Sequence, residues 1–145
     1  MSAPQQLPFA MQRVVCFALL LGMVTFTIAV AVFLQSNDGV GLLSPPMQEL
    51  HVPVVVTGIA TALVALLLRA MLGKRVAAAS EQQRSAARFV ATLVPLALIE
   101  GACLFAQVVW LLNGAPVPNL VTVLGLLSVA ISIVPMQDPD RQRAE

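Results

Sequence analysis

The chain has 145 residues, of which 59% are hydrophobic and only 10% are charged, and its formal net charge is +1. A soluble domain of this size is roughly 45–50% apolar and about 25% charged. The composition therefore excludes an ordinary water-soluble globule, a disordered chain and a nucleic-acid-binding protein. A mean hydropathy of +0.90 indicates a small integral membrane protein surrounded by the lipid bilayer.

Four apolar stretches are predicted to be transmembrane helices, because about 20 mostly apolar residues cross a bilayer as a helix. The alternation typical of strands is absent from all four. The predicted fold is therefore all-α: an integral membrane four-helix bundle, made of two hairpins, in one transmembrane domain that covers residues 1–145. The predicted helices span approximately residues 14–34, 52–72, 89–112 and 120–136.

The first apolar stretch raises the alternative of a cleaved signal peptide. The apolar core of such a signal is about 7–15 residues long and ends at a small-residue cleavage site. The stretch from Val14 to Leu34 has 21 residues without a charge, and Ala29-Val30-Ala31 resembles a cleavage site only faintly. We therefore expect a helix that is retained.

The basic residues predict the orientation, because cytoplasmic loops are enriched in Lys and Arg. In a four-span topology all 8 basic residues fall on one side of the membrane. Arg13 precedes the first span, and Arg141 and Arg143 follow the fourth. The inner end of the second span and the loop that follows it hold the others: Arg69, Lys74, Arg75, Arg84 and Arg88. We therefore expect a multi-pass protein of a bacterial inner (cytoplasmic) membrane with cytoplasmic N- and C-termini.

Two connections carry local signals. The segment AAASEQQRSAAR between the second and third spans is rich in helix formers, which predicts an inward extension of the third helix. Asn113-Gly114 and the two prolines Pro116 and Pro118 predict a tight hairpin on the other side. The third and fourth helices should therefore be antiparallel neighbours.

Glu100 is the residue that most needs an explanation. It is twelfth in a predicted span of 24 residues, near the centre of the bilayer. A charged side chain there costs roughly 2.5–3.5 kcal/mol on insertion scales, and such residues usually face the bundle interior or a water-filled cavity. Because a low dielectric disfavours the charge, we expect a neutral carboxyl when the site is dry.

Other polar residues are expected near this acid. Helical periodicity places Cys103 and Gln107 on the same face of the third span. The other three spans offer Thr25, Thr61 and Ser128 at a similar depth. The predicted intramembrane polar site consists of Glu100, Gln107, Cys103, Thr25, Thr61 and Ser128.

Two interpretations of Glu100 remain open. As a structural clasp, it donates a hydrogen bond to a Thr, a Ser or a backbone carbonyl of another helix, and the protein acts through helix–helix association, as a homo-oligomer or with a membrane partner. Alternatively, Glu100 titrates in a proton- or cation-linked carrier or a c-subunit-like component. Replacing it with Gln separates the two, because the amide keeps the hydrogen bond and abolishes the titration.

Motifs for chemistry are scarce. Cys16 and Cys103 are expected to be free thiols at different depths, and His51 to be a solvated loop residue. No Gly-rich phosphate loop, nucleophile elbow or zinc motif occurs in the sequence. We therefore expect no catalytic residues, no metal and no cofactor, and a protein that is not an enzyme.

An internal repeat is suggested by a shift of 79 residues, which places Gly22 on Gly101. The shared pattern is A-L-x-x-G-x-x-x-F-x-x-x-V. It predicts a parallel repeat of two hairpins, in which Leu21 takes the place of Glu100.

The stretch from Leu96 to Gly114, LALIEGACLFAQVVWLLNG, resembles the third helix of a family of small four-helix bacterial membrane proteins without an assigned activity. That helix reads LxE-G-x-x-LF-x-x-V-x-x-LL-x-G, and the chain ends soon after a proline, here Pro135. The resemblance implies a class of protein and no mechanism. The matching positions are Glu100, Gly101, Leu104, Phe105, Val108 and Gly114.

The second and third spans together are similar to the hairpin of a c subunit of rotary ATPases, which implies an ion-carrying role for Glu100. The chain departs from that family, because TGIATALVA holds one glycine in place of a glycine ladder, the basic loop is long, and two further helices flank the hairpin. Small multidrug exporters also have four helices and one membrane glutamate, but theirs lies in the first helix.

Overall fold

A computed structural model describes residues 9–114 and 117–134, and the regular structure within them is entirely helical. The all-α prediction is therefore confirmed. The long helices are α1 (Phe9–Ser36), α2 (His51–Ala78), α3 (Glu81–Asn113) and α4 (Val117–Ile133), and a short 3-10 helix, Gln48–Leu50, leads into α2.

Within the described residues, three helices are long and apolar enough to cross a membrane, with spans Phe9–Ser36, His51–Ala78 and Gln83–Asn113. At 1.5 Å per residue, the 28 residues of α2 extend about 42 Å and the 17 residues of α4 about 26 Å. The hydrocarbon core of a bilayer is about 30 Å thick. The long helices therefore project beyond it, whereas α4, a shorter apolar helix, is slightly shorter than the core is thick.

The helix ends differ from the predicted bounds. The first three helices extend beyond the apolar stretches, because backbone hydrogen bonding continues into polar segments at the membrane surface. The segment before Phe89 belongs to α3, as its helix-forming composition predicts. The fourth helix ends at Ile133, earlier than the predicted residue 136; residues 135 and 136 lie outside the described part.

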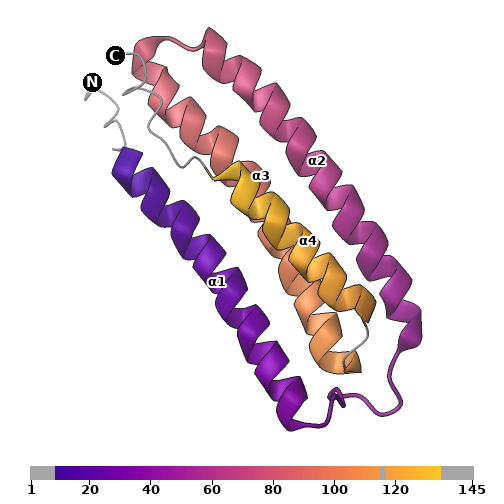
Figure 1. The fold of residues 1–145 in the computed structure, drawn as a ribbon. Coiled ribbons are helices and arrows are strands. Elements are labelled where there is room, and N and C mark those ends of the chain that lie inside the picture. Colours follow the sequence, from indigo (N-terminus) through magenta and orange to yellow (C-terminus); the bar gives the residue numbers. More distant parts are fainter. Residues whose placement is uncertain (1–8, 115–116, 135–145) are drawn as a thin grey trace.

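Helix α3 is the centre of the bundle and packs against the other three helices. The predicted antiparallel neighbours α3 and α4 do pack together. The predicted first hairpin is different, because α1 and α2 lie on opposite sides of α3 and α4 and do not pack along each other (Figure 1). Loop connectivity alone therefore did not determine which helices are neighbours.

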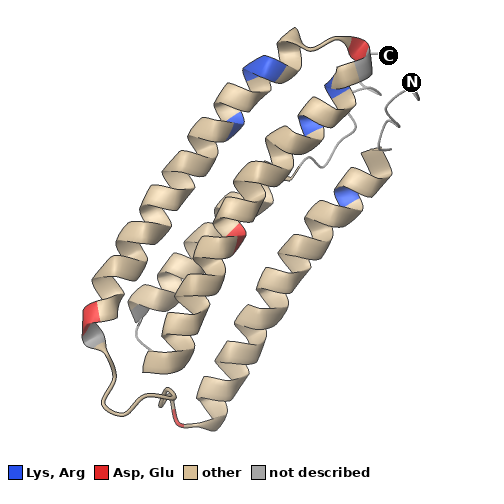
Figure 2. Cartoon of the chain, turned by 180° about the vertical axis from the view of Figure 1, so that it is seen from behind, with Lys and Arg blue, Asp and Glu red and all other residues tan. Residues whose placement is uncertain are grey.

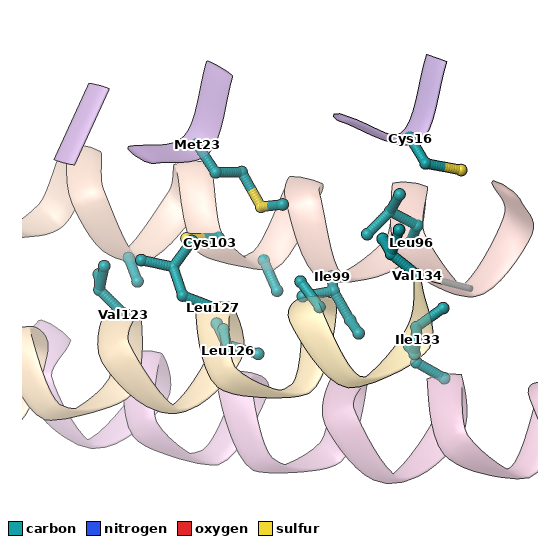
Figure 3. Close-up of a cluster of buried hydrophobic side chains, with 14 of the residues drawn as sticks. Cys16, Met23, Leu96, Ile99, Cys103, Val123, Leu126, Leu127, Ile133 and Val134 are labelled. Carbon is teal, nitrogen blue, oxygen red and sulfur yellow. The ribbon is translucent and has the colours of Figure 1, made fainter. Parts of the chain in front are cut away.

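The core lies around α3, where α1, α2 and α4 meet it. Cys16 and Met23 of α1 point toward α3, and Val123 and Leu127 of α4 point toward the same core from the other side (Figure 3). A second buried cluster joins Trp110 of α3 to Val30 and Leu34 of α1.

Contact between α2 and α4 depends on one glycine. A Cβ atom added at Gly58 would lie 2.6 Å from Cγ2 of Thr122. Close backbone approach at small residues is typical of packed membrane helices. Gly58 therefore sets the spacing of these two helices.

The loop between α1 and α2 covers one end of the bundle, which we call the loop end. Its Leu42 and Leu43 amides donate to the carbonyls of Leu111 and Leu112, with N–O distances of 3.1 and 2.9 Å. The Met47 amide donates to Oδ1 of Asn113 (2.7 Å). These bonds satisfy groups at the C-terminal end of α3 that the helix itself leaves unpaired.

The opposite end, at the turn from α2 to α3, carries the positive charges, and we call it the basic end. Figure 2 shows the described Lys and Arg residues gathered there, with acidic positions at the loop end, in the turn and in the middle of α3. Gln12 of α1 donates to the Ser85 hydroxyl of α3 (3.0 Å). The Arg69 guanidinium donates to the Ser132 carbonyl, near the C-terminus of α4.

Helices α1 and α3 run in the same direction, from the basic end to the loop end, as the parallel repeat requires (Figure 1). A shift of 79 residues places each buried residue of α1 on a buried residue of α3. The buried residues of α1 are Gln12, Cys16, Met23, Val30 and Leu34, and their counterparts are Ala91, Pro95, Ala102, Val109 and Asn113.

Candidate functional site

Glu100 lies in α3 and is half-buried, at the border between the packed and the exposed sides of this helix. Ala97, Gly101 and Leu104, which surround it on the helix surface, are exposed, whereas Ile99 and Cys103 are buried. Within residues 9–114 and 117–134, no hydrogen bond or ion pair reaches its carboxyl group. The acid is therefore unpaired inside the described part of its own chain.

Gln107, two turns along α3, makes the polar contact between α1 and α3. Its side chain is fully buried, and Nε2 donates to the Met23 carbonyl (3.0 Å) and to Oγ1 of Thr27 (2.6 Å). The Thr27 hydroxyl in turn donates to the same Met23 carbonyl (2.8 Å). The interhelical clasp that the sequence suggested for Glu100 is therefore made by Gln107.

Cys103 lies on the same face of α3, between Glu100 and Gln107. Its side chain is 0% exposed and belongs to the main hydrophobic cluster, near Met23 of α1 (Figure 3). Cys16 is also buried, and both thiols are free. A buried cysteine behaves as a small hydrophobic residue, so Cys103 contributes packing to the predicted polar site.

Among the described residues, no hydrogen bond joins Glu100 to any of the three expected partners from the other helices. Thr25 is exposed on α1, and Thr61 is half-buried on α2. Ser128 is exposed and donates to the Leu124 carbonyl of its own helix (2.8 Å). The sequence analysis missed Thr27, although its spacing of four residues from Met23 and three from Val30 puts it on their side of α1.

An uncovered face of α3 adjoins Glu100. It is formed by exposed residues, and we call it the α3 face: Ala97, Leu98, Gly101, Leu104, Phe105 and Val108. In Figure 2, α3 lies in front of α4, with α1 and α2 to its sides, and no other helix crosses this view of it. A Cβ atom added at Gly101 would meet nothing within 4 Å. The α3 face therefore has room for close helix packing.

Four buried polar atoms in the loop-end half of the bundle have no hydrogen-bond partner among the described residues. Three are donors, Nε1 of Trp110 and Nδ2 of Asn113 and Asn119, and one is an acceptor, Oε1 of Gln107. Buried polar groups normally bind protein or ordered water. This half of the bundle therefore contains polar groups that can bind water.

The chemistry open to this arrangement is limited. The described residues contain no group of three or more His, Cys, Asp and Glu side chains that could hold a metal ion. A carboxyl group beside an apolar face can accept or donate a hydrogen bond, form an ion pair, or exchange a proton.

No protein-family model, no curated protein and no solved structure matches the chain.

Proposed function

We propose that this chain is a multi-pass protein of a bacterial inner membrane that acts through helix–helix association. The α3 face is its contact surface, and Glu100 is the polar group at the contact. One observation carries this proposal: a carboxyl group in the middle of a membrane-spanning helix has no partner within the described chain.

The free energy of the unpaired acid supports association. Polar groups gain no hydrogen bond from lipid tails, and a central charge costs roughly 2.5–3.5 kcal/mol on insertion scales. A partner helix that offers a hydrogen bond or an opposite charge lowers this cost. Association through Glu100 therefore gains free energy. A purely apolar surface would not gain it, because lipid tails contact such a surface as well as a partner helix does.

The shape of the surface supports the same conclusion. Ala97 and Gly101 are four residues apart, and both are exposed beside Glu100. Small residues at this spacing let two helix backbones approach closely, which strengthens van der Waals contact. The occupant is then a second copy of the chain or another membrane protein.

Photo-crosslinking in intact membranes tests this function. A benzophenone amino acid at Leu104 samples the α3 face, and one at Val64 samples an exposed position of α2. We expect discrete crosslinked proteins from Leu104 and lipid adducts alone from Val64. Lipid adducts alone from both positions would refute association through α3.

Proton or cation carriage is the second candidate function. It is favoured by the same unpaired carboxyl and by the unpaired polar atoms toward the loop end. In this case, a carbodiimide should label Glu100 rapidly and with a pH dependence, and Glu100→Gln should abolish proton-dependent activity. Slow labelling that is independent of pH would exclude it.

We further propose that the basic end is cytoplasmic, because it holds the described Lys and Arg residues. Reporters fused at Ser80 and at the C-terminus should then read cytoplasmic, and a reporter at Gly41 should read external. An external reading at Ser80 would reverse this orientation.

The proposed role needs no catalytic group, so we propose a protein that is not an enzyme.

A further inference from the structure

We propose that the helix that covers the α3 face belongs to a different membrane protein and carries a Lys or Arg at the depth of Glu100. This inference rests on the proposed association and names the chemistry of its partner. It follows from the unpaired acid, from the distribution of charge along the bundle and from the shape of the α3 face.

Without a partner the Glu100 carboxyl is expected to be neutral in dry lipid, and a cation is the partner that stabilises its ionised form. A hydrogen bond between membrane helices contributes only a modest free energy. An ionised side chain at the centre of the bilayer costs more free energy than one such hydrogen bond returns. Ionisable groups inside membranes usually pair with one another for this reason. A cationic partner therefore complements Glu100 better than a hydroxyl or an amide.

The position of the basic residues disfavours a second copy. Two copies inserted with the same topology present the same residues at the same depth, so Glu100 of one copy faces the midplane of the other. All the described Lys and Arg residues lie toward the basic end (Figure 2). Arg88, the nearest one along α3, is twelve residues away, or about 18 Å along the helix axis. A homodimer would therefore bring two acids together.

Arg69 lies farther from the basic end than the other basic residues of α2, and its side chain already makes a hydrogen bond. Arg69 of α2 donates to the Ser132 carbonyl at the end of α4. This contact places its guanidinium where it compensates the partial negative charge of the α4 C-terminus. Arg69 of a second copy would have to leave this bond to reach Glu100, so it is a poor donor for the α3 face.

The surface also fits a single helix. Ala97 and Gly101 are small and exposed, and Gly101 has open space above it. Leu98 and Leu104 are exposed on either side of them. A partner backbone can therefore approach between the two leucines, which brings a central Lys or Arg side chain next to Glu100.

Designed helices provide a direct test in lipid vesicles. The probes are three synthetic 21-residue Leu/Ala helices with Lys, Gln or Leu at the central position, and binding to the labelled full chain is measured by fluorescence energy transfer. We expect the Lys helix to bind at least ~10-fold more tightly than the Leu helix, with the Gln helix in between. Glu100→Gln should remove this preference, and the control Glu49→Gln, an exposed acid at the loop end, should leave it unchanged.

Equal binding of the Lys and Leu helices to the wild-type chain would overturn the inference, and so would a preference that survives Glu100→Gln. Self-association of the chain in vesicles that is lost in Glu100→Gln would assign the surface to a second copy instead. Crosslinking from Leu104 without any Lys preference would refute the cationic partner alone. Absence of that crosslinking would refute the association itself.

Discussion

Gln107 of α3 donates a hydrogen bond to Thr27 of α1 with an Nε2–Oγ1 distance of 2.6 Å, and both side chains also donate to the Met23 carbonyl. One backbone carbonyl thus accepts from two side chains on different helices. This arrangement fixes the rotation of α1 against α3 at the level of Gln107. Glu100, two turns away, takes no part in it.

The Gln107–Thr27 contact should be measurable as a coupling energy. A double-mutant cycle with Gln107→Leu and Thr27→Val should give about 0.6–1.7 kcal/mol, the range for hydrogen bonds between membrane helices. The free energy of unfolding in bicelles provides the measurement. The control Thr25→Val, an exposed position two residues away, should show a coupling near zero with Gln107→Leu. A coupling of the same size for both threonines would contradict the geometry.

Glu100→Leu should leave the isolated chain as stable as the wild type, or more stable. The substitution removes no hydrogen bond within the described part of the chain and relieves the cost of a polar group in lipid. We expect a change in the unfolding free energy of less than about 0.5 kcal/mol, or an increase. A loss of about 0.6–2 kcal/mol would restore Glu100 as an intrachain clasp.

Several features could be predicted from the sequence because they depend on composition along the chain. Length and hydropathy are enough to find the apolar helices. The helix-forming residues before Phe89 predict the extension of α3. The alternation of basic and uncharged loops predicts that the cations share one end, as the described residues do. The depth of Glu100 follows from its place in the span.

Which side of each helix is packed could not be predicted. In a soluble protein, polar residues mark the outside of a helix, but lipid and core are both apolar here. Leu21 is at least as hydrophobic as Met23, yet Leu21 is exposed and Met23 is buried. For the same reason hydropathy does not distinguish Thr25, the predicted polar partner on α1, from Thr27, which contacts Gln107. The contacts of α3 follow from packing that hydropathy does not encode.

Gly58→Ala should destabilise the contact between α2 and α4. The new methyl group would lie 2.6 Å from Cγ2 of Thr122, whose rotamer is held by a hydrogen bond to the Pro118 carbonyl (2.9 Å). Overpacking of this kind costs about 1–3 kcal/mol of unfolding free energy. Gly73→Ala on the same helix, with nothing within 4 Å, is the matched control and should be neutral or stabilising. Equal effects at both glycines would argue against the close approach.

Asn113→Ala should loosen the loop that covers the loop end. Its Oδ1 accepts the Met47 amide at 2.7 Å, and a lost hydrogen bond of this kind costs about 0.5–1.5 kcal/mol. Amide hydrogen exchange at Met47 should therefore accelerate up to ~10-fold. The control Ser36→Ala, an exposed residue bonded within its own helix turn, should not change it. Unchanged exchange in Asn113→Ala would show that the loop is held without this side chain.

The central claim is that Glu100 serves a contact outside its own chain. Crosslinking from Leu104 in membranes, compared between the wild type and Glu100→Leu with the helical content of both measured by circular dichroism, tests it most directly. We predict that the yield of crosslinked protein falls at least ~10-fold in Glu100→Leu, corresponding to about 1.4 kcal/mol or more of binding free energy, while helical content stays the same. An unchanged yield of the same crosslinked protein would contradict the claim.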